Sequence, residues 1–364
     1  MAALTSWQHH VVTANDLADG SPDKPQQWVQ VAARVFPELG TVSKAKRARI
    51  AGNLLLNGQS QVPTLTSAAV NDTFAYFSPE KHKQLFTSTN TNNPRALSWV
   101  KTCKTQGLRV VYECSNLAVV EKPVGIHVKG RSKRTMEHAL PLLLQTQQAA
   151  EAGDFELPMP HAVHRLDYRV GGLLLVAKTR KTEVDLSAQL ERHSVTKQYR
   201  AILVGNVREK IPTRDRNKPG VASIELPSAL MEIQDELHFL DGEIDNKQCL
   251  TAMRIVSTTR SARYEWISTV DLWPLTGRKH QLRIHTARHG HPIVGDDLYH
   301  DTIGQSVVRG MGLFLFSVGI AFDDIVGNRR SFHIQEPNKF ARFRHFCGLN
   351  WMKHARKTHA KNIE

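Results

Sequence analysis

The sequence predicts an α+β fold in which a central mixed or antiparallel β-sheet is flanked by helices and loops, with a small α/β module in front of it. From Val110 onward, segments typical of strands outnumber those typical of helices and follow in irregular order. Leu173–Ala177 is a continuous apolar run, as in a strand that is covered on both faces. Lys197–Leu203 instead alternates between two faces, as in a strand with one buried side.

The N-terminal part of the chain predicts two helices and a hairpin. Residues 28–36 repeat apolar side chains at helical spacing, and Pro37 ends that helix. A second helix follows Thr41, and its cationic side chains are Lys44, Lys46, Arg47 and Arg49. Asn57-Gly58 between two extended runs indicates a hairpin, because both central residues of such a turn need positive φ. This part is therefore expected to form a compact unit that presents positive charge.

A stretch rich in Ser, Thr and Asn from Thr87 to Pro94 indicates a linker between this unit and the strand-rich part. The C-terminal end is again rich in Lys and Arg. The expected segments are a flexible N-terminal tail over 1–26, the α/β module over 27–80, the linker over 81–109, the main domain over 110–340 and a basic tail over 341–364.

The overall charge indicates a polyanionic partner. The chain of 364 residues, long enough for two or three modules, carries 48 Lys and Arg against 34 Asp and Glu, a net charge of +14. Charge alone equally fits a basic but otherwise ordinary enzyme. The four cysteines show no C-x-x-C pairing, so neither a zinc site nor a disulfide framework is indicated. The longest mostly apolar stretch, 310–322, is too short to cross a bilayer, and no membrane partner is expected.

The densest cluster of chemically active residues is Pro160–Leu175, where a short polar loop containing Asp167 precedes two glycines and a buried strand. Loops fixed by a rigid strand are common positions for catalytic groups. The alternative is a surface ion pair between Asp167 and Arg165 or Arg169, which would be purely structural.

A second cluster, Pro274–His285, combines a Thr-Gly helix start with basic residues, and Gly290 ends the predicted helix. His280 and Arg283 share one side of that helix at i, i+3. A solvated basic face is the alternative interpretation. The following turn holds an acidic pair, Asp296-Asp297, and Tyr299. Neither cluster shows metal-ligand spacing, a P-loop or a dinucleotide fingerprint.

Together these segments resemble the RluA-type family of RNA pseudouridine synthases. The motifs that carry the resemblance occur in order along the chain: Glu121-Lys122-Pro123-Val124-Gly125, His164-Arg165-Leu166-Asp167 with Gly172–Leu175, Lys197-x-Tyr199-x-Ala201, and Gly277–His285 with Gly295, Asp296 and Tyr299. The module over 27–80 also resembles the S-four-type RNA-binding module that precedes many such domains, which assigns its four cationic side chains to RNA binding.

The resemblance implies a pseudouridine synthase fold and an isomerase that detaches uracil from C1′ of ribose and rejoins it through carbon 5. It implies Asp167 as the catalytic carboxylate, Arg283 as its ion-pair partner and Tyr199 as the ring that stacks on the base. Arg165 would fill the space that the flipped base leaves. The other residues expected to contact substrate are His164, Arg278, His280 and Gln281.

No cofactor and no metal are implied, and the partner would be ribosomal or transfer RNA. We expect a monomer without an obligate protein partner. Scattered cysteines and an N-terminus without the Arg-rich pattern of a transit peptide favour an intracellular location, the cytoplasm first, with nucleus and organelles left open.

The chain departs from the family where a Thr-Ser pair usually follows the aspartate, since Val170-Gly171 stands there. This departure keeps open a catalytically inactive RNA-binding protein on the same scaffold. A glycosidase for free nucleosides is a further alternative, although it would not need the basic module. Residues 206–248 are longer than the family's usual connection and predict a peripheral insertion.

Overall fold

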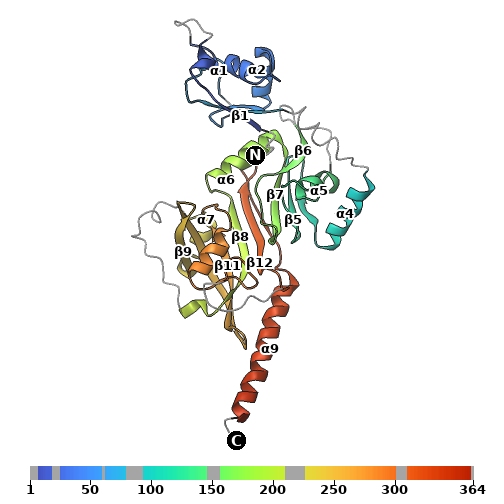
Figure 1. The fold of residues 1–364 in the computed structure, drawn as a ribbon, viewed down its shortest axis with the longest axis vertical. Helices are drawn as coiled ribbons and strands as arrows, with labels where there is room; N and C mark the ends of the chain where they lie inside the picture. The colour runs from blue at the N-terminus through green and yellow to red at the C-terminus, as the bar shows by residue number, and fades with distance from the viewer. Residues whose placement is uncertain are drawn as a thin grey trace.

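The computed structural model describes residues 7–18, 25–59, 62–78, 93–145, 156–209, 226–300 and 310–361. Within them, ten strands form a central sheet in the order β4-β5-β7-β12-β8-β11-β10-β9, with β6 paired to β7 and β13 to β12 (Figure 1). These strands are β4 (Arg109–Glu113), β5 (Leu117–Lys122), β6 (Glu156–Ala162), β7 (Gly171–Thr179), β8 (Thr196–Val204), β9 (Leu237–Ile244), β10 (Lys247–Ser261), β11 (Glu265–Pro274), β12 (Leu315–Asp323) and β13 (Arg329–His333).

The sheet is mixed, which confirms the predicted fold class. β12 runs parallel to β7 and antiparallel to β8. The strand that comes last in the sequence therefore lies between the other two. All nine residues of β7 are buried, as its apolar sequence predicted. Six of the nine residues of β8 are also buried, and β12 and β11 pair with its two edges. The strand-rich part of the chain has one large core, with a smaller separate cluster around Leu250 and Trp273.

Helices pack on this sheet and at its ends. α6 lies on β7, α5 on β6, and α8 lies against the edge strand β9 and the neighbouring strands β10 and β11. α9 packs on β10 at its start and then extends away from the sheet (Figure 1). The helices of this domain are α4 (Pro94–Thr105), α5 (Met136–Leu143), α6 (Arg180–Glu191), α7 (Ser228–Met231), α8 (Gln281–Arg288) and α9 (Asn338–Lys361), with the short 3-10 helices η2 (Val207–Glu209) and η3 (Gln234–Glu236).

The N-terminal module has its own core and its own sheet, drawn in blue at one end of the molecule (Figure 1). Trp28 and Phe74 are fully buried at its centre. The predicted turn forms, since Asn57 and Gly58 have φ values of 50° and 78°. The hairpin predicted around it was wrong, because in the described residues only Gln59 bridges back to Leu56, and residues 54–56 pair instead with residues 74–76. Its elements are β1 (Trp7–Val11), η1 (Asn15–Leu17), α1 (Trp28–Val35), α2 (Val42–Ile50), β2 (Leu54–Leu56) and β3 (Thr73–Phe77), with β3 central in the sheet.

Arg180, the first residue of α6, joins the module to the main domain. Its Nε donates to the carbonyl oxygen of Gly52 at 2.8 Å, and its guanidinium lies 3.8 Å from the ring centroid of Trp7. The same guanidinium pairs with Glu183. Since Arg180 is almost fully buried, this one side chain connects α6 to two segments of the module.

Three predicted segment boundaries were wrong. The predicted flexible tail over 1–26 includes β1, which pairs with β3 along its full length and packs Trp7 on Phe77. The predicted linker over 81–109 includes α4 and the start of β4, which bury Val100 and Leu108. The described residues of the predicted basic tail, 341–361, belong to α9, where Phe343 and Cys347 are buried one turn apart.

The predicted insertion over 206–248 contributes β9, the edge strand beside β10, so part of it belongs to the sheet. Residues 210–225 of that segment lie outside the described residues, as do 1–6, 19–24 and 362–364 of the predicted tails and 81–92 of the predicted linker.

Three strands meet at Gly172, and the meeting requires a glycine. Ser317 of β12 is paired with Gly172 of β7 on one side and with Tyr199 of β8 on the other. Gly172 has a φ of +113°, and a Cβ there would lie 2.1 Å from the carbonyl oxygen of Ser317. This backbone contact sets how closely β7 approaches β12, directly after the loop that carries Asp167.

We predict that Gly172→Ala lowers the free energy of unfolding by at least about 2 kcal/mol, because the added methyl meets backbone in a left-handed conformation. Denaturation with urea measures this change. Gly130→Ala is the matched control, since its Cβ would meet only the Thr135 methyl at 3.8 Å. Equal stability of the two variants would contradict the close approach of β7 and β12.

Candidate active site

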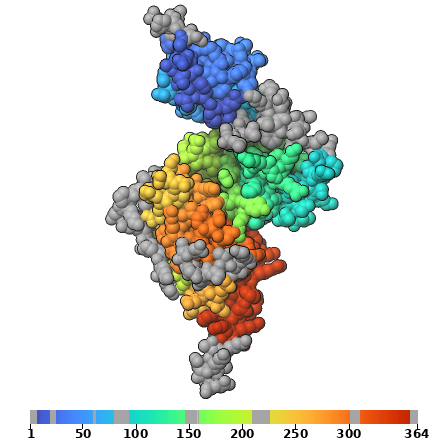
Figure 2. Space-filling model, viewed as in Figure 1, coloured from blue at the N-terminus to red at the C-terminus, as the bar shows by residue number. Residues whose placement is uncertain are grey.

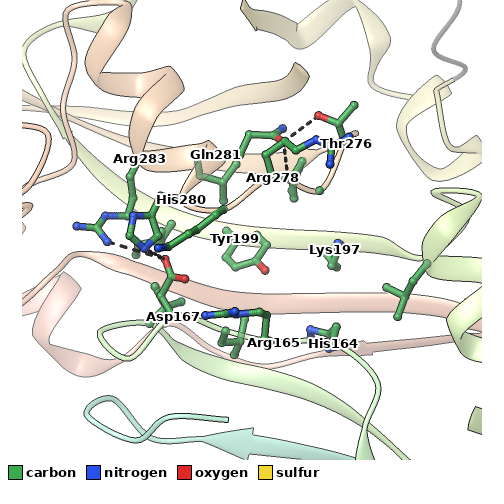
Figure 3. Close-up of a pocket in the computed structure, with 18 of the residues that line it drawn as sticks. His164, Arg165, Asp167, Lys197, Tyr199, Thr276, Arg278, His280, Gln281 and Arg283 are labelled. Atoms are coloured by element: carbon green, nitrogen blue, oxygen red, sulfur yellow. Dashed lines mark hydrogen bonds and ion pairs between the residues drawn. The ribbon is translucent and has the colours of Figure 1, made fainter. Parts of the chain in front are cut away.

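A cavity of about 390 Å³ opens between the loop that precedes β7 and the segment that leads into α8. Figure 3 shows the two predicted clusters on opposite sides of it, with Tyr199 from β8 between them. The lining residues include all eight predicted catalytic and substrate-binding residues: His164, Arg165, Asp167, Tyr199, Arg278, His280, Gln281 and Arg283. The structure therefore brings together residues that are far apart in the sequence.

Asp167 lies in a loop that is fixed at both ends. Before it, the His164 Nε2 accepts a hydrogen bond from the backbone N–H of Leu175 at 3.0 Å. After it, the N–H of Val170 donates to the carbonyl oxygen of Asp167 itself at 3.0 Å. Leu166, just ahead of Asp167, is buried. The carboxylate of Asp167 is thus held at the cavity wall while staying 22% exposed.

Arg283 is the cation behind Asp167, and Asp296 holds it in place. Arg283 Nε and Nη2 donate to the two carboxylate oxygens of Asp296 at 2.6 and 2.7 Å, a bidentate ion pair. Its remaining nitrogen, Nη1, lies 3.9 Å from Asp167 Oδ2. Both partners of the bidentate pair are almost fully buried. The guanidinium can therefore turn only one nitrogen toward Asp167.

The pKa values of this pair follow from that geometry. Burial opposes both charges, but the hydrogen bonds and opposite charge of the partner outweigh it. The pKa of Arg283 therefore lies above its ordinary value and the pKa of Asp296 below its own. Asp296 also accepts hydrogen bonds from the backbone N–H groups of Leu298 and Tyr299, which satisfies its carboxylate further.

His280 is the second group next to Asp167. Its Nε2 lies 3.6 Å from Asp167 Oδ2, and its Nδ1 is 2.9 Å from the Tyr299 hydroxyl. Burial lowers the pKa of His280 although the Asp167 charge acts in the opposite direction, so the ring is neutral at neutral pH. The residue has a positive φ of 57°, a conformation that histidine tolerates better than most side chains.

Tyr199 forms the floor of the cavity between the two clusters (Figure 3). Burial, together with the nearby charge of Asp167, raises the pKa of its hydroxyl well above the ordinary value, and a hydrogen bond with Ser317 offsets only part of this. The phenol therefore stays protonated at neutral pH. It offers the cavity a ring face and a neutral hydroxyl.

Two buried lysines near the site were not among the predicted site residues. Lys122 is fully buried and donates to the carbonyl oxygens of Pro123 and Ile126 at 3.0 and 2.7 Å. Burial lowers its pKa to about 7, and the charge of Asp167 acts against this shift. Lys197 lines the cavity beside His164, and burial lowers its pKa as well. The sequence did contain a signal for both lysines. Lys122 belongs to the Glu121–Gly125 motif, and Lys197 is the first residue of the motif that contains Tyr199.

Some predicted contacts have a structural role in the protein. The Gln281 Oε1 accepts from the Thr276 hydroxyl and from the N–H of Arg278 (Figure 3), and its Nε2 donates to Leu250 and Thr251. Its hydrogen-bonding groups are therefore engaged in bracing the 276–278 turn. The imidazole of His164 likewise binds backbone. Arg165 is exposed at the mouth of the cavity, as its predicted role requires.

The surface ion pair considered for Asp167 does not form, because Arg169 pairs with Asp297 and donates to the carbonyl oxygen of Gly295 at 3.1 Å. The Val170-Gly171 departure also has a packing explanation. Val170 is buried, and a Cβ at Gly171 would lie 2.7 Å from the Phe316 ring and 2.9 Å from the Lys122 carbonyl oxygen. A hydroxyl-bearing side chain at Gly171 would not fit against Phe316.

Lys44, Lys46 and Arg47 are exposed on α2, where RNA could reach them. Arg49 points elsewhere, since its Nη1 donates to the carbonyl oxygen of Val62 at 3.1 Å. It therefore contributes to the fold of the module.

Residues 116–288, which include the Asp167 loop, Tyr199 and Arg283, match the RNA pseudouridylate synthase family. This segment belongs to the pseudouridine synthase family. Ribosomal large subunit pseudouridine synthase D of Zymomonas mobilis subsp. mobilis is 30% identical over 195 residues, 53% of this chain and 56% of that protein. Ribosomal large subunit pseudouridine synthase C of Rickettsia felis is 29% identical over 280 residues, 73% of this chain and 79% of that protein. This confirms the family predicted from the ordered motifs.

Among solved structures, human RNA pseudouridylate synthase domain containing 4 matches with a TM-score of 0.47 at 20% identity, over 68% of this chain and 94% of that chain. In the described part of the chain, no helix is long and apolar enough to cross a membrane.

We predict that Asp296→Asn lowers the free energy of unfolding by about 3–5 kcal/mol, because it leaves the buried Arg283 guanidinium without its counter-charge. Asp297→Asn is the matched control, since its carboxylate is 54% exposed and should contribute less than about 1 kcal/mol. Denaturation with urea measures both. Similar losses for the two variants would contradict the assignment.

The same pair predicts a pH dependence. Because the folded state lowers the pKa of Asp296, its contribution to stability is complete above 3.8, the ordinary value for the carboxyl. That contribution disappears as the pH falls through the lowered pKa. The difference in unfolding free energy between wild type and Asp296→Asn should therefore shrink in acid. A constant difference down to the acid transition would show that the charge is not responsible.

Proposed function

We propose that this protein isomerises uridine to pseudouridine in large-subunit ribosomal RNA, with Asp167 as the catalytic carboxylate. The observation that carries this is the position of Asp167, which is the acidic side chain at the cavity between Tyr199 and the paired Arg283. The printed names of the C and D relatives support the choice of ribosomal RNA.

The reaction needs a carboxylate because breaking the bond between uracil N1 and ribose C1′ builds positive charge on C1′. Asp167 faces the cavity and can stabilise that charge at close range. Carbon 5 of the detached ring then bonds to C1′ and loses its proton, while N1 gains one. The product nucleoside therefore contains the same atoms as uridine.

Arg283 and His280 position the carboxylate of Asp167 from behind. One guanidinium nitrogen at 3.9 Å and one imidazole nitrogen at 3.6 Å lie beside its Oδ2 and restrict where its oxygens point. Fixed dipoles and charges of this kind need no reorganisation during the reaction. Because Asp296 neutralises most of the Arg283 charge, Asp167 is not locked in a bidentate pair of its own and stays available to the ribose.

Tyr199 provides the face on which the uracil ring rests while it turns. A protonated phenol suits this role, since a phenolate would repel the Asp167 carboxylate. A uridine in a folded RNA must leave its stack to reach the cavity, which costs a few kcal/mol. Arg165, exposed at the mouth, is placed to occupy the vacated position in the RNA. Lys44, Lys46 and Arg47 of the N-terminal module contribute phosphate contacts that give affinity without sequence information.

The experiment that tests this proposal measures tritium release from RNA labelled at carbon 5 of uracil. We predict that wild type releases tritium from large-subunit ribosomal RNA and that Asp167→Asn slows release by at least about 1,000-fold while RNA binding persists. Asp324→Asn, in the turn between β12 and β13, is the matched control and should react like wild type.

Full activity of Asp167→Asn would refute the mechanism. Transfer RNA offered in parallel tests the substrate, and release from it alone would overturn the choice of ribosomal RNA. If wild type binds both RNAs and releases tritium from neither, the protein is the inactive RNA-binding scaffold.

A further inference from the structure

A second hollow lies outside the active site, between α4 and the loop that precedes α5. Its volume is about 470 Å³, and its walls are formed by one face of α4 and by Arg134. The α4 residues that line it are Pro94, Arg95, Ser98, Trp99 and Thr102. It thus combines two guanidiniums, two hydroxyls and an indole, and no carboxylate is among these lining residues.

Arg134 belongs to an exposed basic loop with a fixed base. The N–H of Met136 donates to the carbonyl oxygen of His127 at 2.9 Å, and the N–H of Glu137 donates to that of Val128 at 3.1 Å. Between these two hydrogen bonds, residues 129–134 form a loop in which every residue is exposed. Its cationic side chains are Lys129, Arg131, Lys133 and Arg134. The loop therefore presents concentrated positive charge from a stable attachment.

The same attachment contacts the catalytic loop. The His127 ring lies 4.6 Å from the ring of Tyr168, the residue next to Asp167, and the N–H of Gly125 donates to the Tyr168 carbonyl oxygen at 2.8 Å. Arg134 is seven positions after His127, so the two residues lie within about 25 Å of each other. In Figures 1 and 2 this cyan-to-green part of the chain lies on one flank, beside β5 and below the blue module. One RNA can therefore touch both sites at once.

We propose that the hollow between α4 and the 129–134 loop binds a single-stranded nucleotide of the substrate RNA that flanks the target uridine. Arg95 and Arg134 contact its phosphate, the Ser98 hydroxyl donates to a phosphate or sugar oxygen, and the base stacks on Trp99. The Thr102 hydroxyl donates to the Ser98 carbonyl oxygen at 3.1 Å and lines the wall beside them. The inference rests on the proposed function of the active site and extends it with a place where the substrate is held.

The chemistry of the hollow favours RNA over an acidic protein. Guanidiniums pair with phosphate in a bidentate manner and stack with bases, and an aromatic ring beside them is the usual platform for an unpaired base. Trp99 is only partly buried, so part of its ring is open to the hollow. An acidic peptide would need the cations but would leave the indole unused.

The test compares charge reversal at the hollow with charge reversal on the opposite face of α4. Arg95→Glu/Arg134→Glu removes both cations from the hollow, whereas Lys104→Glu changes an exposed residue on the opposite face of the same helix and serves as the control. The probes are a C5-tritiated transcript of large-subunit ribosomal RNA and a uridine oligonucleotide too short to reach both sites. Affinity is measured over a series of salt concentrations.

The proposal predicts that the double variant binds the long transcript at least about tenfold more weakly and that its salt slope falls by about one to two. Lys104→Glu should bind within about twofold of wild type. Tritium release at saturating long RNA, and release from the short oligonucleotide, should stay near wild type for all variants. A rise in KM without loss of kcat separates a holding site from damage to the active site.

Unchanged affinity and salt slope in the double variant would overturn the proposal and would leave an acidic protein surface as the ligand of this hollow. Equal weakening by Lys104→Glu would also overturn it, because general charge would then explain binding. If wild type releases no tritium, the proposed isomerisation fails, whereas the affinity comparison still decides whether the hollow holds RNA.

Discussion

The buried ion pair between Arg283 and Asp296 is the interaction on which the active site depends. Removing two charges from water is costly unless geometry and hydrogen bonds compensate, and here the Nε/Nη2 edge of the guanidinium and both carboxylate oxygens are engaged. The pair joins α8 to the turn that follows it and leaves one guanidinium nitrogen for Asp167. The charge of the site is thus set by three side chains from segments that are separate in the sequence.

The second constraint is steric and lies on the other side of Asp167. Gly172 allows β12 to approach β7, and the paired Ser317 reaches the Tyr199 hydroxyl from the same strand. The loop of Asp167 ends where this junction begins. Its carboxylate is therefore positioned by a buried charge on one side and by close backbone packing on the other. Both constraints act inside the protein, on side chains and backbone that are almost entirely buried.

Much of this arrangement could be predicted from the sequence, because motif residues lie next to features with clear local signals. The apolar run of β7, the turn at Asn57-Gly58 and the helix that carries Arg283 all follow from short-range patterns. Which acid of Asp296-Asp297 pairs with Arg283 could not be predicted. It is decided by the backbone at Gly295, where a Cβ would lie 2.0 Å from the Gly312 carbonyl oxygen, a contact made across the fold.

The wrong boundaries of the predicted tail and linker also arise from contacts made across the fold. Charged residues in α9 and polar residues before α4 suggested a tail and a linker, but Cys347 and Val100 are buried by partners that only the folded chain supplies. Tertiary contacts decided these two cases against the local pattern. They also add a structural role for Gln281, which was predicted as a substrate contact and is bonded to the 276–278 turn and to β10.

The most direct test of the account is the rate of tritium release by Arg283→Lys at saturating C5-labelled ribosomal RNA. Lysine keeps the charge opposite Asp296 but cannot bind it bidentately while reaching Asp167. If the ion pair positions the carboxylate, kcat falls at least about 100-fold with unchanged RNA affinity, since small displacements of a reacting group are that costly. A wild-type kcat in Arg283→Lys would show that Asp167 is positioned by something else.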